Sequence, residues 1–296
     1  MNGFIIIDKE KDLTSFKANA VVRGILGIKK TGHTGTLDPM ATGVLPVALG
    51  GSAKFIEILP CHEKSYTASF RLGETTDTLD ITGKTLTTCD IIPDKNEVIN
   101  IFNYFKGEIE QLPPMYSAIK KNGVRLYELA RQGVEIEREK RIVTIKKLEF
   151  ISFRNGVYTI DVDCTEGTYI RSLISDIGER LGCGAVMTDL RRTFSNGFSI
   201  DNAHTLDELR QAKQSGKIND FIIPTDKALD SYDSVTVSEA QAKRFSNGGE
   251  LDAERLKKEL SPALYRVYSP EHKFLGLGEK RADEPFLRIK RLLVGD

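Results

Sequence analysis

The sequence predicts a mixed α/β protein with a largely antiparallel sheet, followed by a small β-rich second domain. Strand-like and helix-like segments alternate without the regular strand–helix–strand order that builds a parallel sheet. The 296 residues exceed the usual size of one domain. Beyond Asp230 the pattern changes to short alternating strands and turns, so we expect domains at residues 1–230 and 231–296.

Strands are predicted by short apolar runs and by alternation of apolar and polar residues. The clearest alternation places Tyr66, Ala68 and Phe70 on one face of a strand. Asn155-Gly156 separates two further strand patterns and indicates a hairpin. The predicted strands cover residues 3–7, 65–72, 141–151, 157–164, 263–268, 274–278 and 286–293.

Helices are predicted where apolar residues recur at helical spacing after a capping residue. Thr14-Ser15 precedes one such pattern, which ends at Gly27, and Pro93-Asp94 precedes another. Thr168 is expected to cap a third helix, with Tyr169 and Arg171 in its first turn. Shorter helical patterns cover residues 125–132 and 204–217.

Composition excludes several classes of protein. No apolar run approaches the roughly 20 residues that span a bilayer, and the N-terminus lacks the pattern of a signal peptide, so we expect a cytoplasmic protein. The formal net charge is zero, so a nucleic-acid partner would need a local basic patch. Four cysteines and four histidines are scattered without metal-ligand spacing. No P-loop, nucleophile elbow or dinucleotide fingerprint is present, so the sequence predicts neither a metal nor a cofactor.

One stretch, residues 30–46, has a composition unsuited to a helix or a regular strand. It contains three glycines, two prolines, His33 and Asp38, and therefore predicts a loop with special backbone angles. Such residues are common in ordinary surface turns. A carboxylate held before a proline in this loop is also a candidate nucleophile or general base. Residue types alone leave both interpretations open.

A second unusual stretch, about residues 108–147, combines cations with aromatic rings. From Lys120 to Lys147 it has nine Lys or Arg against four Glu, a local balance of +5. A solvated loop–helix insertion would have this charge. With Tyr116 and Tyr127 it also suits RNA, because cations neutralise phosphates and rings stack on bases.

Arg171, outside this stretch, also has two interpretations. It could form a surface ion pair, or it could serve a functional site at a strand-to-helix junction.

Ordered motifs along residues 3–225 resemble the TruB family of tRNA pseudouridine synthases. The signature G-H-T-G-T-L-D-P-M-A-T-G-V-L-P includes Asp38. The others are G-F-x-x-x-D-K at 3–9, K-x-Y at 64–66, L-G-x-x-T-D-T-x-D at 72–80, Q-x-P-P-x-Y-S-A-x-K at 111–120, Y-x-x-A-R-x-G at 127–133, G-T-Y-I-R-S-L at 167–173 and L-R-R at 190–192.

The resemblance implies the pseudouridine synthase fold and isomerisation of uridine to pseudouridine at conventional position 55, in the TΨC arm of tRNA. No cofactor or metal is implied. The target base would be flipped out of the RNA. Residues 108–147 would clamp the RNA, and residues 231–296 would form a PUA-like RNA-binding domain. We expect a monomer whose partner is the tRNA TΨC stem-loop.

The resemblance also implies roles for individual residues. Asp38 matches the nucleophile, which would attack either C6 of uracil or C1′ of ribose. Tyr66 matches the tyrosine that stacks on the base, and Arg171 the arginine paired with the aspartate. His33 matches a histidine that contacts the RNA. The residues that match positions in or near the base pocket are Tyr169, Leu190 and Lys9.

Two other functions remain open from the residues. A non-catalytic RNA-binding or tRNA-folding protein could use the same basic surface, although it would not need Asp38, Tyr66 and Arg171 together. A phosphotransferase forming an aspartyl-phosphate would need metal-binding carboxylates close to Asp38 in sequence, and none are adjacent.

Overall fold

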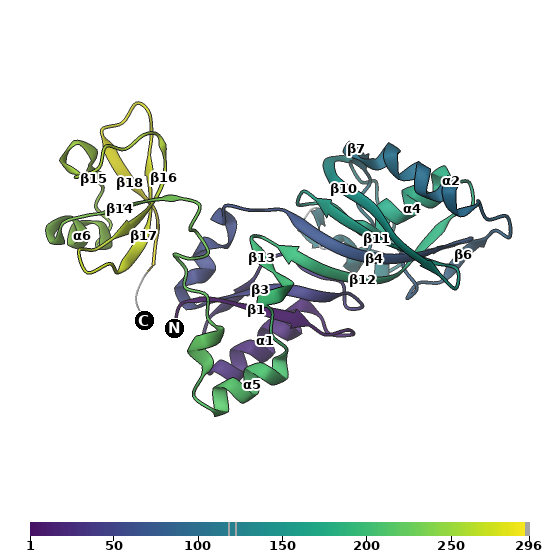
Figure 1. Cartoon of the computed structure of the whole chain (residues 1–296), viewed down its shortest axis with the longest axis horizontal. Coiled ribbons are helices and arrows are strands. Elements are labelled where there is room, and N and C mark those ends of the chain that lie inside the picture. Colours follow the sequence, from purple (N-terminus) through teal and green to yellow (C-terminus); the bar gives the residue numbers. More distant parts are fainter. Residues whose placement is uncertain (118, 122, 294–296) are drawn as a thin grey trace.

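One large sheet runs through most of the molecule (Figure 1). The computed structural model describes residues 1–117, 119–121 and 123–293. Within these residues the strand order is β1-β3-β12-β4-β11-β10-β7, with β2 paired to β3 and β13 paired to β12. The strands are β1 (Gly3–Lys9), β2 (Thr31–His33), β3 (Thr42–Leu49), β4 (Lys64–Leu72), β7 (Gly107–Gln111), β10 (Arg141–Arg154), β11 (Val157–Cys164), β12 (Ala185–Ser195) and β13 (Phe198–Ser199).

The pairing in this sheet is largely antiparallel, which confirms the predicted fold class. Strands β3 and β12 are the exception, because they run parallel with Gly43 opposite Arg192. Gly43 has a φ of +99°, and a Cβ at this position would lie 2.1 Å from the Arg192 carbonyl oxygen. Only glycine therefore fits where the two halves of the sheet join.

Helices cover the sheet and bury its apolar faces. Ile5 and Ile7 of β1 pack with α1 and α5 on one face, whereas Phe4 and Ile6 are buried on the other. Burial on both faces explains why β1 is a continuous apolar run. The helices are α1 (Ser15–Leu26), α2 (Lys95–Ile101), α3 (Leu126–Arg131), α4 (Ile170–Arg180), α5 (Leu206–Gln214) and α6 (Glu239–Ser246).

The other half of the sheet has a core of its own beneath α2 and α4. Tyr66, Ala68 and Phe70 point into it from β4, as their alternation predicts. The hairpin of β10 and β11 turns at Asn155 and Gly156, whose φ angles of 51° and 78° match the predicted turn. This core also contains the Asp38 loop's apolar residues, so the loop is attached to the fold.

The C-terminal residues form a β-rich domain around a second sheet. Its order is β14-β16-β17-β18-β15, and it buries a separate apolar cluster. Phe274 of this sheet packs on Phe55 of the N-terminal part, with ring centroids 6.0 Å apart. The strands are β14 (Asp233–Thr236), β15 (Leu251–Asp252), β16 (Ala263–Tyr268), β17 (Phe274–Lys280) and β18 (Phe286–Leu292).

Two small hairpins project from the larger sheet. Strands β5 (Glu74–Thr76) and β6 (Thr85–Thr88) form one, and β8 (Lys120–Lys121) and β9 (Val124–Arg125) the other. The second hairpin and α3 belong to the predicted insertion. Residues 118 and 122 of that insertion, and residues 294–296 of the predicted second domain, lie outside the described residues.

The structure corrects two local predictions. Thr168 does not cap α4; Tyr169 occupies the N-cap position, and the Thr168 hydroxyl donates to the Thr165 carbonyl instead. Residues 30–46 are not one continuous loop, because β2 and the start of β3 lie within them and leave a loop at residues 34–41. Pro46 is tolerated inside β3, and its carbonyl accepts from the Thr34 amide.

None of the described helices combines the length and the apolar character needed to cross a membrane.

Candidate active site

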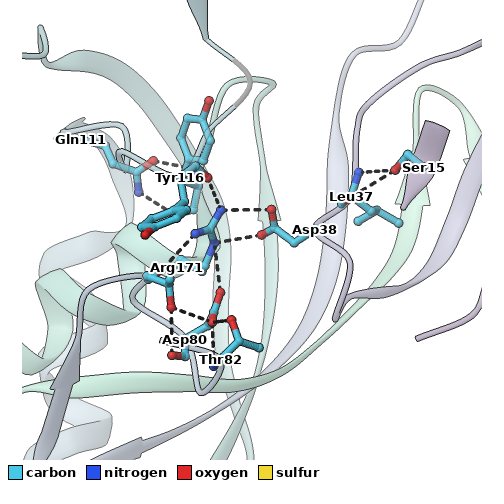
Figure 2. A network of polar contacts seen from close by, with 10 residues as sticks. Ser15, Leu37, Asp38, Asp80, Thr82, Gln111, Tyr116 and Arg171 are labelled. Atoms are coloured by element: carbon cyan, nitrogen blue, oxygen red, sulfur yellow. Dashed lines mark hydrogen bonds and ion pairs between the residues drawn. The ribbon is translucent and has the colours of Figure 1, made fainter. Parts of the chain in front are cut away.

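Asp38 and Arg171 form a bidentate ion pair (Figure 2). Arg171 Nε lies 2.9 Å from Asp38 Oδ2, and Nη2 lies 3.0 Å from Oδ1. The Arg171 side chain is 5% exposed and that of Asp38 35% exposed. The interpretation of Arg171 as a surface ion pair is therefore wrong, whereas the carboxylate remains within reach of a substrate.

Arg171 is held by main-chain carbonyls as well. Nη1 donates to the Thr78 carbonyl at 2.9 Å, and Nη2 donates to the Tyr116 carbonyl at 2.8 Å. Thr78 lies in the segment between β5 and β6, and Tyr116 belongs to the predicted insertion. The guanidinium therefore connects three separate segments of the chain to Asp38, in the fork geometry that only arginine offers.

A second carboxylate, that of Asp80, lies close to the Arg171 side of this ion pair. Its Oδ2 is 3.8 Å from Arg171 Nε, and its Oδ1 accepts from the Thr78 hydroxyl at 2.8 Å and from the Thr82 amide at 2.9 Å. The side chain is buried. Sequence reasoning did not select Asp80 as a site residue, although it ends the T-D-T-x-D motif, and its flanking threonines are typical of a carboxylate that orders a turn.

The loop on either side of Asp38 is fixed by side chains from elsewhere. The Leu37 amide donates to Ser15 Oγ at 2.8 Å (Figure 2). Lys9 is fully buried, and its Nζ donates to the Pro39 carbonyl at 3.1 Å and to the carbonyls of Glu10 and Leu13. Burial lowers the pKa of Lys9 to about 8, while the charge of Asp38 acts in the opposite direction. The structure thus places Lys9 under the loop as a support for its backbone.

Tyr66 and Leu190 lie beside the loop. They project from β4 and β12 into the buried cluster that also contains Leu37 and Met40. Burial raises the pKa of Tyr66 to about 12, and the positive charge of Arg192 opposes this shift. A neutral phenol ring next to Asp38 is suited to stacking against a planar base.

Tyr169 is positioned by Gln111, the last residue of β7. The Gln111 side chain accepts from the Tyr169 amide at 2.7 Å and donates to the Tyr169 carbonyl at 3.0 Å. Burial raises the pKa of the Tyr169 hydroxyl. Gln111 was not selected from the sequence, although it opens the Q-x-P-P motif.

His33 ends β2, opposite Val47 of β3. Burial and the charge of Arg192 lower its pKa, so the imidazole is neutral at pH 7. The charged group that acts on His33 is thus Arg192. Arg192 belongs to the L-R-R motif but was not predicted to be a site residue.

The predicted insertion presents cations around an aromatic ring. The guanidinium carbons of Arg125 and Arg131 lie 5.8 and 5.5 Å from the centroid of the Tyr127 ring. Both arginines are exposed. This arrangement suits a polyanion with exposed bases.

In the described part of the chain, no three His, Cys, Asp or Glu side chains gather so as to hold a metal ion. The arrangement offers a carboxylate held by a guanidinium, next to aromatic and apolar side chains. Such a group can attack an electrophilic carbon or accept a proton.

Comparison with known proteins assigns the chain to a class of enzyme. Three family models match in succession: "TruB family pseudouridylate synthase (N terminal domain)" over residues 23–170, "tRNA pseudouridylate synthase B C-terminal domain" over 171–230, and "Pseudouridine synthase II TruB, C-terminal" over 234–293. A solved Cbf5–Nop10–Gar1 complex contains a similar chain, with a TM-score of 0.75 and 26% identity over 99% of this chain and 85% of that one. The chain therefore has the fold and the sequence of a pseudouridine synthase, an isomerase.

Curated relatives narrow the class to one family. The "tRNA pseudouridine synthase B" of Clostridium tetani is 44% identical over 99% of this chain and 100% of the relative. That of Pseudomonas fluorescens is 40% identical over 96% of this chain and 93% of the relative. The chain belongs to the TruB family of pseudouridylate synthases. Membership favours the isomerase over the phosphotransferase and over a protein that only binds RNA.

Proposed function

We propose that this protein isomerises uridine to pseudouridine at position 55 in the TΨC loop of tRNA. The observation that carries the proposal is the bidentate pair of Asp38 and Arg171, which holds one partly exposed carboxylate beside Tyr66. The names of the curated relatives support tRNA as the substrate.

In this proposal Asp38 is the nucleophile. It attacks C6 of uracil or C1′ of ribose, the glycosidic bond from N1 to C1′ breaks, and the base turns so that C5 bonds to C1′. The bond to Asp38 then breaks, C5 loses its proton and N1 gains one. The bidentate geometry supports nucleophilic attack because Arg171 restrains the carboxylate without covering it. The chemistry uses only protein side chains, and no cofactor has a part in it.

Other residues bind the flipped nucleotide. Tyr66 stacks on the base, and Tyr169 and Leu190 line its pocket. His33 contacts the RNA where the base is extruded. Lys9 acts from beneath, through its hydrogen bond to the Pro39 carbonyl.

The remaining parts of the chain hold the tRNA. Residues 108–147 clamp the RNA through exposed cations and Tyr127, and residues 231–296 act as a PUA-like domain. The catalytic domain then covers residues 1–230. We expect the protein to act as a monomer in the cytoplasm, on the TΨC stem-loop of tRNA.

The test replaces the nucleophile without changing its size. Asp38→Asn is expected to abolish tritium release from tRNA containing 5-tritiated uridine, while tRNA binding measured by filter retention largely survives. Asp220→Asn, at an exposed position outside the site and outside the two segments proposed to hold the tRNA, is the matched control and should retain full activity. Normal turnover by Asp38→Asn would overturn the proposal.

The exposed cations around Tyr127 favour a second activity, assistance of tRNA folding. Base flipping must open the elbow of the tRNA, so refolding can follow release. The Asp38→Asn protein should still speed the recovery of native structure by a misfolded tRNA. Loss of this effect in a variant that still binds tRNA would exclude a folding role separate from catalysis.

A further inference from the structure

Arg192 is a fully buried cation that the proposed chemistry does not use. Its side chain has no exposed surface and is among the largest buried in the protein. Nε donates to the Val44 carbonyl at 2.8 Å, and Nη2 donates to the Gly35 carbonyl at 2.6 Å. Among the described residues no carboxylate forms an ion pair with it. A buried charge without a counter-ion is costly, so its retention calls for a compensating role.

The two carbonyls lie at opposite ends of the Asp38 loop. Gly35 precedes Asp38 by three residues, and Val44 follows it in β3. Arg192 thus fixes the span of the loop across its base. Gly35, with a φ of +66°, leaves the space that the guanidinium fills, because a Cβ there would be 3.0 Å from Nη1.

The third nitrogen of the guanidinium is not used by either carbonyl. Nη1 is buried and makes no hydrogen bond of standard geometry within the described structure, although a weaker hydrogen-bond interaction between the Arg192 and Tyr66 side chains contributes to the pKa of both groups. Arg192 stands directly opposite Tyr66 in the pairing of β12 with β4. Side chains of opposed residues emerge on the same face about 5 Å apart, so the guanidinium and the phenol are neighbours.

The pKa of the Tyr66 phenol is affected by the nearby charge of Arg192. Burial raises the pKa of the phenol, and the charge of Arg192 is the largest influence that lowers it. The other ionisable groups that act on Tyr66 are Cys164 of β11 and Asp38, and both raise its pKa. Arg192 is therefore the group that favours the phenolate.

We propose that Arg192 is a positioning residue for the isomerisation, which fixes the Asp38 loop through Gly35 and orients the Tyr66 hydroxyl with its remaining guanidinium donor. The inference rests on the proposed function only in that Tyr66 contacts the base. The contacts of Arg192 with the Asp38 loop and with Tyr66 are present in the RNA-free protein, so they can be tested without tRNA.

The first experiment measures the phenol directly. Tyr66 is replaced with 3-fluorotyrosine, and the RNA-free protein is titrated by ¹⁹F NMR in three backgrounds: parent, Arg192→Gln and Arg191→Gln. Loss of the Arg192 charge should raise the fluorophenol pKa by about 1 unit or more. Arg191 is the adjacent residue of β12 but pairs with Asp8, so its variant should titrate like the parent. An unchanged pKa in folded Arg192→Gln would overturn the proposal.

The second experiment separates positioning from binding. Arg192→Lys retains the charge but not the two carbonyl bonds, and should slow single-turnover tritium release about 10- to 100-fold with tRNA affinity within about twofold of the parent. Its effect should be less than additive with Tyr66→Phe, because the two residues act together. Fully additive effects would contradict the assignment.

A third measurement keeps Arg192 intact, in case neither variant folds. The ¹⁵N–¹H resonances of the Arg192 guanidinium are compared between the parent and Tyr66→Phe. They should shift when the hydroxyl is removed, and identical resonances would overturn the proposal. Because these spectra need no RNA, failure of the inference is distinguishable from failure of the proposed tRNA activity.

Discussion

Gln111 hydrogen-bonds both the amide and the carbonyl of Tyr169, at 2.7 and 3.0 Å. One side chain at the end of β7 thereby fixes the residue from which α4 starts. Arg171 follows two positions later, so the guanidinium that holds Asp38 depends on this contact for its direction.

Gln111→Leu should therefore weaken both stability and catalysis. The Tyr169 amide loses its partner, which costs about 1–3 kcal/mol of unfolding free energy, whereas the Tyr169 carbonyl still accepts from the Leu173 amide. Urea unfolding measures the stability, and single-turnover tritium release measures the activity. Gln211→Leu, on the exposed face of α5, is the control. A Gln111→Leu protein as stable as this control would show that the contact is dispensable.

Arg171→Lys should reduce activity far more than tRNA affinity. An ammonium group cannot reproduce the planar fork that reaches both Asp38 oxygens and the carbonyls of Thr78 and Tyr116. The expected loss is about 100-fold or more in the single-turnover rate, as for a misplaced reacting group. Arg180→Lys, at the exposed end of α4, should behave like the parent. Equal losses in rate and in affinity would instead assign Arg171 to RNA binding.

The lowered pKa of Lys9 should make the free energy of unfolding depend on pH. Its pKa is about 8 in the folded protein, against 10.5 for an ordinary lysine. Between these values the unfolded chain binds more protons, so unfolding free energy rises with pH. Compared with Lys9→Met, the parent should gain up to about 3 kcal/mol from pH 8 to 10.5, with a constant difference at lower pH. Chemical denaturation across this range provides the measurement, and parallel curves would contradict the assigned burial.

Gly43→Ala should severely destabilise the protein. The added Cβ would meet the Arg192 carbonyl at 2.1 Å in a backbone region that L-residues avoid. Strain and overpacking together should cost about 3 kcal/mol or more. Gly24→Ala is the matched control, since a Cβ there meets nothing within 4 Å and alanine is favoured inside α1. The control should be slightly more stable than the parent by thermal unfolding.

Local patterns predicted the elements that depend on local physics. The alternation at Tyr66 and the Asn155-Gly156 turn led to the correct strands. Alternation follows directly from burial of one strand face, and Asn-Gly is favoured by the positive φ angles of the turn. Strand β12 was not identified, since its sequence mixes apolar, charged and polar residues. It is fixed by partners on both sides, β4 and β3, which lie far away in the chain.

The site likewise contains residues that a local motif reveals and residues that only long-range contacts reveal. The composition of its loop drew attention to Asp38, and the resemblance paired it with Arg171. The supporting contacts of Ser15, Gln111 and Asp80 join segments separated by tens of residues, so no short motif reveals them. Thr168 was mistaken for a cap because its residue type is favourable, whereas its hydroxyl bonds back to the Thr165 carbonyl and Tyr169 takes the N-cap position.

The bond between Arg171 and the Tyr116 carbonyl has a mechanical consequence. Tyr116 lies at the root of the basic insertion, and the nitrogen that binds its carbonyl is the one that binds Asp38 Oδ1. A displacement of the insertion that removes this acceptor frees an N–H on that nitrogen and allows the guanidinium to rotate. The position of the carboxylate is thereby coupled to the position of a surface element through one shared nitrogen atom, without any change in the large sheet.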